Sequence, residues 1–178
     1  RFVGEEDVTD LNSAPFILRW FIPLLRDHQH QLPSDLRARC LEALRLALEE
    51  IERIDVGIIY TNIRIKADFA LIVGGHLLGD VRLQQVGQAR WAEWVRFTVD
   101  SGAPREYNSL TYMGMNLAML AKLQEMADDP VVRLQARLMY ERFWLHAILH
   151  VHRPTRQLAG PHARCYWTPM VTGRERFT

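Results

Sequence analysis

The sequence has few cysteines, no long hydrophobic run and almost no net charge. Its two cysteines, Cys40 and Cys165, lie too far apart to predict a disulfide framework or a zinc site. The most apolar run, residues 69–78, is about ten residues long, whereas a membrane-spanning helix needs about 20. The net charge is +1, which gives no indication of a basic surface for nucleic acid. We therefore expect neither a membrane span nor a nucleic-acid partner.

The composition is that of a soluble globular protein. Of the 178 residues, 48% are hydrophobic and 24% are charged, which is enough apolar surface to bury a core. Apolar residues recur with the period of a helix, and no segment alternates as a strand does. The sequence predicts a single all-α domain over residues 1–178. Residues 168–178 lack an apolar stripe, so we interpret them as a linker or a cleavage end.

Six helices are predicted, and the connections between them are short. Short connections make consecutive helices antiparallel neighbours, so the six should form three hairpins. The pair Gly74–Gly75 lacks the spacing of a phosphate-binding loop and is expected to allow close helix packing. The first predicted helix begins near residue 13, and the other five cover residues 33–53, 61–78, 80–100, 109–127 and 129–151.

The hairpins resemble one another. Asn12, Asn62 and Asn108 stand at the starts of the first, third and fifth helices, at spacings of 50 and 46 residues. These odd-numbered helices carry little charge, whereas the even-numbered helices have a charged face. An inner layer of odd helices and an outer layer of even helices accounts for both patterns. The sequence thus predicts antiparallel helical hairpins in two layers, about half of an α/α toroid.

Two polar loops, residues 106–112 and 160–166, concentrate titratable side chains beside apolar helices. Such residues are not needed for a core, so we interpret the loops as two edges of one site. Two alternatives remain open: Asn62 is only a helix cap, and Arg164 only bonds loop carbonyls while Tyr166 packs on Trp167. The candidate catalytic residues are Glu106, His162, Arg164 and Tyr166, and the candidate substrate-binding residues are Asn62, Tyr107, Asn108 and Tyr112.

The sequences of the two loops, E-Y-N-S-L-T-Y and G-P-H-A-R-C-Y, resemble motifs of a group of largely uncharacterised bacterial and fungal proteins expected to be α/α toroids. Their usual pattern is similar to E-Y-N-S-P-T-Y followed by G-P-x-x-R-x-Y. The resemblance covers about residues 90–167, and Leu110 replaces the usual proline. It implies a distant similarity to toroid polysaccharide lyases and glycoside hydrolases, and therefore an oligosaccharide substrate.

The residue types favour β-elimination on a uronate. Such a lyase neutralises the carboxylate beside the carbon that loses its proton, and it supplies a base and an acid. Arg164 and Asn108 could hold the carboxylate while His162 or Tyr166 moves protons. A glycoside hydrolase instead needs two carboxyl groups. Glu106 is the single acid of the two motifs, although Asp10 and Asp68 could join it.

No cofactor or metal is predicted, and a partner chain is. His146 and His150 have a spacing that can bind zinc, but we expect them to provide polar packing near a helix end. Three hairpins cannot close a toroid, so the apolar inner surface should stay exposed and promote self-association or pairing with a second chain that completes the ring. A non-catalytic helical scaffold that binds a partner on its concave surface is the alternative function.

Overall fold

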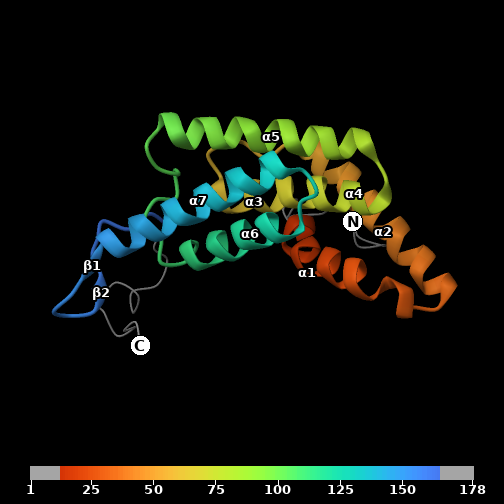
Figure 1. Ribbon diagram of the computed structural model, residues 1–178, viewed down its shortest axis with the longest axis horizontal. Helices are drawn as coiled ribbons and strands as arrows, with labels where there is room; N and C mark the ends of the chain where they lie inside the picture. Colours follow the sequence, from red (N-terminus) through yellow and green to blue (C-terminus); the bar gives the residue numbers. More distant parts are fainter. Residues whose placement is uncertain (1–12, 165–178) are drawn as a thin grey trace, which may run out of the picture.

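The computed structural model describes residues 13–164, and they form a helical fold (Figure 1). The all-α prediction is confirmed. The elements are α1 Ser13–His28, η1 Gln29–Gln31, α2 Ser34–Ile54, α3 Thr61–Phe69, η2 Ala70–Gly74, α4 Gly75–Leu78, α5 Val81–Asp100, α6 Met113–Met126, α7 Pro130–Leu149, β1 Val151–His152 and β2 Gln157–Leu158. The predicted linker at residues 168–178 lies outside the described residues.

Local capping explains where several helices begin. The Asp80 carboxylate accepts a hydrogen bond from the Leu83 amide at the start of α5. Asp129 accepts one from the Val131 amide, and Pro130 occupies the first turn of α7. α3, η2 and α4 run on without a break and together form the predicted helix over residues 61–78.

Two predicted boundaries were wrong. The fifth helix begins at Met113 instead of Ser109, because Asn108 has a positive φ of 51° and the Ser109 hydroxyl accepts a hydrogen bond from the Tyr112 amide. The side chain thus forms a turn that competes with the helix. The sixth helix ends at Leu149, because the next residues enter a two-stranded antiparallel hairpin of β1 and β2.

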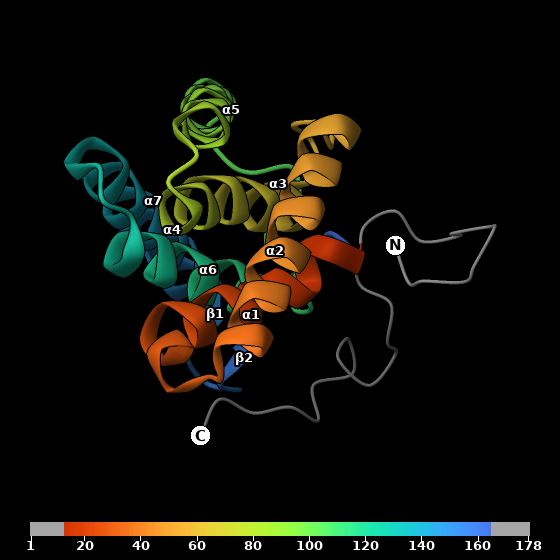
Figure 2. The same cartoon turned by 90° about the vertical axis from the view of Figure 1, so that its right-hand side faces the viewer.

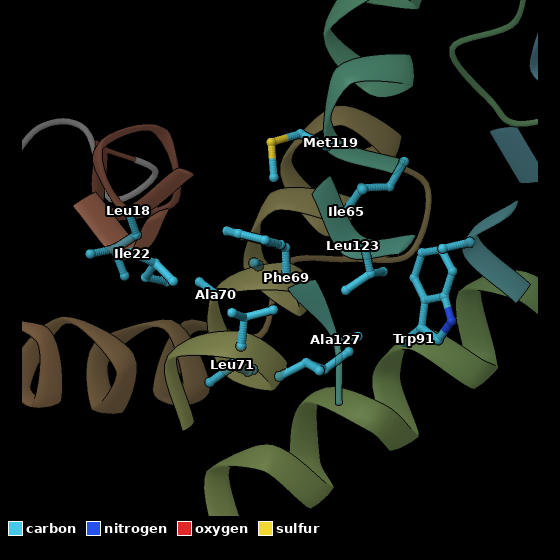
Figure 3. Packing of buried hydrophobic residues seen from close by; sticks show 14 of the residues in the cluster. Leu18, Ile22, Ile65, Phe69, Ala70, Leu71, Trp91, Met119, Leu123 and Ala127 are labelled. Atoms are coloured by element: carbon cyan, nitrogen blue, oxygen red, sulfur yellow. The ribbon is translucent and has the colours of Figure 1, made fainter. Parts of the chain in front are cut away.

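The segment formed by α3 and η2 is the centre of the fold. Residues 64–75 are all buried, and Figure 2 shows α3 and α4 surrounded by α1 and α2, by α5, and by α6 and α7. In Figure 3, Phe69 and Leu71 lie between Leu18 of α1 and Leu123 of α6. The predicted inner position of the third helix is therefore the position observed.

Charged side chains interrupt the apolar core inside α3. Arg64 contacts the buried Asp68 carboxylate at 3.1 Å and donates to the backbone oxygens of Val56 and Arg90. Burial raises the pKa of Asp68 to about 7, against the opposing effect of Arg64. The second oxygen of Asp68, Oδ1, has no hydrogen-bond partner among the described residues. Pairing with Arg64 offsets part of the cost of burying this carboxyl group.

Glycines allow α5 to approach the central segment closely. A Cβ atom on Gly75 would lie 2.8 Å from the Gln84 nitrogen, and one on Gly87 would lie 2.7 Å from the Leu71 Cβ. The expected role of Gly74–Gly75 in close packing is confirmed. Trp91 and Trp94, which are also on α5, are fully buried and stack with their ring centroids 5.2 Å apart.

Exposed apolar residues lie on an outer helix as well as on an inner one. The inner helix α1 exposes Ile17, Trp20 and Leu24, but α7, the sixth predicted helix, exposes a longer series. The sequence predicted an exposed apolar surface on the inner layer, and the exposed series on the outer helix α7 was not foreseen. No helix within residues 13–164 has both the length and the apolar character needed to cross a membrane.

Candidate functional site

The two polar loops lie against each other in the fold. Asn108, which precedes α6, donates from its side-chain nitrogen to the carbonyl oxygens of Ala159 and Pro161 at 2.7 and 2.9 Å. The Ala163 amide donates to the Tyr107 carbonyl at 3.2 Å. The Asn108 carbonyl accepts a hydrogen bond from the His162 ring nitrogen Nδ1 at 3.0 Å. Backbone and side-chain contacts thus join segments that are more than 50 residues apart in sequence.

Asn108 holds this junction in a special backbone conformation. Its φ of 51° is in the left-handed region, which asparagine adopts more readily than most residues. Both hydrogens of its side-chain nitrogen are used by loop carbonyls. Asn108 therefore positions the 159–164 segment against the loop that precedes α6.

Glu106 connects the junction to the central helix. Its carboxylate accepts hydrogen bonds from the backbone nitrogen and the side-chain nitrogen of Asn62, both at 2.7 Å. Arg164 lies 3.2 Å from the same carboxylate. The Glu106 side chain is almost completely buried, so these contacts replace the water that an exposed carboxylate would bind.

Lys66 extends the network into the core. Its ammonium group donates to the backbone and side-chain oxygens of Asn62, at 2.8 and 3.0 Å, and lies 4.2 Å from the centroid of the Phe16 ring. Burial and, to a smaller extent, the Arg19 charge lower the pKa of Lys66 to about 8, and the Glu106 charge opposes both. A buried cation therefore stands one side chain away from Glu106.

Arg164 lies at the exposed edge of the network. Its guanidinium group lies 5.2 Å from the centroid of the Tyr112 ring and reaches the Tyr112 hydroxyl at 3.5 Å. The Arg164 carbonyl accepts a hydrogen bond from Thr111 at 3.4 Å. About a third of the Arg164 side chain, 36%, is exposed. This residue therefore brings positive charge to the surface beside an aromatic ring.

A Tyr–His pair adjoins the junction. The Tyr107 hydroxyl lies 2.8 Å from the His150 Nε2 atom, and the His150 Nδ1 atom lies 2.8 Å from the His146 carbonyl oxygen. Because a carbonyl only accepts, the proton is on Nδ1, and the Tyr107 hydroxyl donates to Nε2. From the sequence, only polar packing was predicted for His150. The spacing of His146 and His150, which places both on one face of α7, was the signal that could have linked them to Tyr107.

A small cavity lies beneath these residues, and it has room for about one water molecule. Burial lowers the pKa of His146, and the neighbouring Arg142 and His150 contribute to the same shift. Among the described residues, no group of three His, Cys, Asp or Glu side chains is placed to hold a metal ion. The cavity is lined by Pro104, Glu106, Tyr107, Asn108, Met113, Phe143 and His146.

Seven of the eight predicted site residues therefore belong to this junction, and their catalytic and substrate-binding roles remain predictions. They are Asn62, Glu106, Tyr107, Asn108, Tyr112, His162 and Arg164. Tyr166 and Asp10 lie outside the described residues. Asp68 lies in the core, paired with Arg64.

Comparison with known proteins places the chain in a family without naming an activity. No curated protein and no solved structure matches it. Residues 7–173 match the profile of a family described as a domain of unknown function, DUF8769. Because this match covers most of the 178 residues, the chain belongs to the DUF8769 family.

Proposed function

We propose that the protein is a carbohydrate-active enzyme of the α/α-toroid type that cleaves a uronate-containing oligosaccharide by β-elimination. The observation that carries this proposal is the position of Arg164. Its partly exposed guanidinium group lies between the Glu106 carboxylate and the Tyr112 ring. Arginine binds carboxylates in a fork geometry, and an aromatic ring packs on the apolar face of a sugar.

The proposed reaction forms one carbon–carbon double bond and breaks one carbon–oxygen bond. A base removes the proton beside the substrate carboxylate, the electron pair forms the double bond, and the leaving oxygen takes a proton. Arg164 neutralises the substrate carboxylate, which stabilises the negative charge that develops on it. Glu106 and Asn108 position Arg164 and its loop.

Two groups at the junction are suited to the proton transfers. His162 carries its proton on Nδ1, which is bound to the Asn108 carbonyl, so its Nε2 atom is the base. Tyr107 protonates the leaving oxygen by turning its one hydroxyl hydrogen away from the His150 Nε2 atom, which lies 2.8 Å from the hydroxyl in the absence of substrate. Tyr107 thereby gains a role in addition to substrate binding.

A non-catalytic helical scaffold is the second candidate. Two observations favour it: the cavity admits about one water molecule, and the Glu106 carboxylate and the Asn108 side-chain nitrogen already bond to Asn62 and to the 159–161 loop. A two-carboxylate glycoside hydrolase has less support. Glu106 is the one acid among the residues that line this cavity, and Asp68 is enclosed in the core.

The test is an absorbance assay on a panel of uronate-containing glycans, because the unsaturated product absorbs in the near ultraviolet. The variants are Arg164→Ala and, as a matched control, Arg153→Ala, which removes an exposed arginine from the neighbouring loop. We expect turnover by the wild-type protein and a loss of about 100- to 1,000-fold in Arg164→Ala. The melting temperature of each variant is measured in parallel.

Three outcomes would count against the lyase. A wild-type protein that is folded and produces no absorbing product from any glycan in the panel would favour the scaffold. Full activity in Arg164→Ala would remove this residue from the mechanism. A loss of activity in Arg164→Ala that is accompanied by a large fall in melting temperature would assign Arg164 a structural role.

A further inference from the structure

α7 is apolar on two opposite sides, and the rest of the chain covers one of them. Its inner side packs against α6 and α5. The buried residues on that side are Val132, Ala136, Met139, Phe143 and Ala147. The residues on the outer side that are more than half exposed include Val131, Leu134, Leu138, Leu145 and Ile148. An apolar stripe that remains exposed after the opposite side has been buried usually marks an interface.

The spacing along the outer side is that of a coiled-coil seam. The positions 131, 134, 138, 141, 145 and 148 alternate steps of three and four residues, which places them on one stripe. All of them are apolar except Glu141. This stripe, called the α7 seam below, therefore has the pattern of a helix that packs along its length against another helix.

We propose that the α7 seam binds the α7 seam of a second copy of this chain, with the two helices antiparallel. A two-fold axis between Leu138 and Glu141 pairs the seam with itself. The two residue numbers of every facing pair then have the same sum. Each apolar residue toward the ends of the seam therefore faces another apolar residue. Val131 faces Ile148 of the second copy, and Leu134 faces Leu145 of the second copy.

Charges near the axis agree with this arrangement. Glu141 lies opposite Leu138 of the second copy and keeps its own partner, Arg137, at 2.9 Å. Arg137 also lies beside Trp144 of the second copy, where a guanidinium group can stack on the indole. In a parallel arrangement, Glu141 of one chain would face Glu141 of the other chain. Two like charges would then lie together at the centre of the seam.

The size of the seam is sufficient for a weak and specific dimer. α7 has 20 residues, which corresponds to a length of about 30 Å. Two such helices in contact along their length, with Trp144 and Leu149 at the margins, bury an area near the lower limit of about 1,000 Å² for specific interfaces. We therefore expect a dissociation constant in the micromolar range. The exposed residues of α1 form a shorter patch, in which the Lys122 ammonium group already lies 3.9 Å from the centroid of the Trp20 ring.

The experiment measures dimerisation by sedimentation equilibrium for the wild type and four variants. In the proposed dimer, the Leu134–Leu145 pair occurs twice, once on each side of the two-fold axis. Leu134→Glu or Leu145→Arg alone therefore places one charge in each of these two pairs. The double variant Leu134→Glu/Leu145→Arg puts opposite charges face to face, but only if the helices are antiparallel. Within one chain the two positions are 11 residues apart, about 16 Å along the helix, so they cannot pair with each other. Leu46→Arg, at an exposed leucine of α2, is the control.

We expect each single seam variant to raise the dissociation constant at least 100-fold and the double variant to recover to within about tenfold of the wild type. Leu46→Arg should dimerise as the wild type does. Circular dichroism should show that all variants are folded, because the changed positions are exposed. A wild-type protein that is monomeric at millimolar concentration overturns the proposal. A double variant that dimerises no more tightly than the single variants overturns the antiparallel pairing. If Leu46→Arg raises the dissociation constant as much as the seam variants do, the interface is not the α7 seam.

Discussion

The carboxylate of Glu106 caps α3 by accepting hydrogen bonds from both nitrogens of Asn62, each at 2.7 Å. The backbone nitrogen of Asn62 is in the first turn of α3, where amides have no partner within the helix. A negative charge at this end is also favourable for the helix dipole. A residue 44 positions away in sequence thus provides the cap, and the candidate site is joined to the centre of the fold.

Replacing Glu106 should therefore destabilise the whole protein. Glu106→Ala leaves buried amide groups of Asn62 without an acceptor, and we expect the free energy of unfolding to fall by about 3 kcal/mol. Glu106→Gln keeps one acceptor and should cost less, about 1–2 kcal/mol. Chemical denaturation measures both. The control is Glu42→Ala, which removes an exposed ion pair and should leave stability nearly unchanged, because water and salt screen exposed pairs. Equal effects of Glu106→Ala and Glu42→Ala would contradict the capping role.

Asn108 contributes in two ways that substitutions can separate. Asn108→Gly loses the hydrogen bonds to Ala159 and Pro161 but accepts the positive φ, and it should cost about 1–2 kcal/mol. Asn108→Ala loses the same bonds and also strains the backbone, which adds about 1 kcal/mol. Unfolding free energies and hydrogen exchange at the Ala163 amide measure the two effects. If the two variants are equally stable, the left-handed backbone has no cost of its own.

The helices could be predicted because their signals are local. Apolar residues recur at helical spacing, and Asp80 and Asp129 stand where caps are needed. The start of α6 could not be placed in this way. Asn108 and Ser109 are common at helix starts. Here the contacts of Asn108 with the 159–164 segment hold it in a left-handed conformation, and the helix begins only at Met113.

The candidate site was only partly predictable, for a different physical reason. The motif loops stood out because polar residues occur beside apolar helices, where a core does not need them. Which residues contact which depends on tertiary packing. Lys66 shows this clearly, because in the sequence it is an ordinary charged helical residue, whereas in the fold it is fully buried against Asn62 and Phe16.

The buried Asp68 should make stability depend on pH. Burial raises the pKa of this carboxyl group from an ordinary value of 3.8 to about 7. Between about pH 4 and pH 7, the folded chain therefore keeps a proton that the unfolded chain has already released. The stability contributed by this group is fully present below about pH 4 and is lost as the pH rises to about 7.

The variant Asp68→Asn removes this titration. Between about pH 5 and pH 7, the unfolding free energy of the wild type should decline relative to that of Asp68→Asn. Denaturation of both proteins at a series of pH values measures the difference, and other titrating groups cancel in it. Parallel curves for the two proteins would contradict a raised pKa for Asp68.

Two glycines should respond in opposite ways to the same substitution. Gly87 lies where α5 meets η2, and an added Cβ would be 2.7 Å from the Leu71 Cβ and 2.9 Å from the Ile72 nitrogen. Gly87→Ala must push the helices apart and should cost about 1–3 kcal/mol. An added Cβ on the exposed Gly114 of α6 meets nothing within 4 Å, so Gly114→Ala should gain about 0.5–1 kcal/mol by favouring the helix. Chemical denaturation compares the pair. A neutral Gly87→Ala would mean that α5 shifts away from the central segment at little cost, and the close approach would then not be a determinant of this fold.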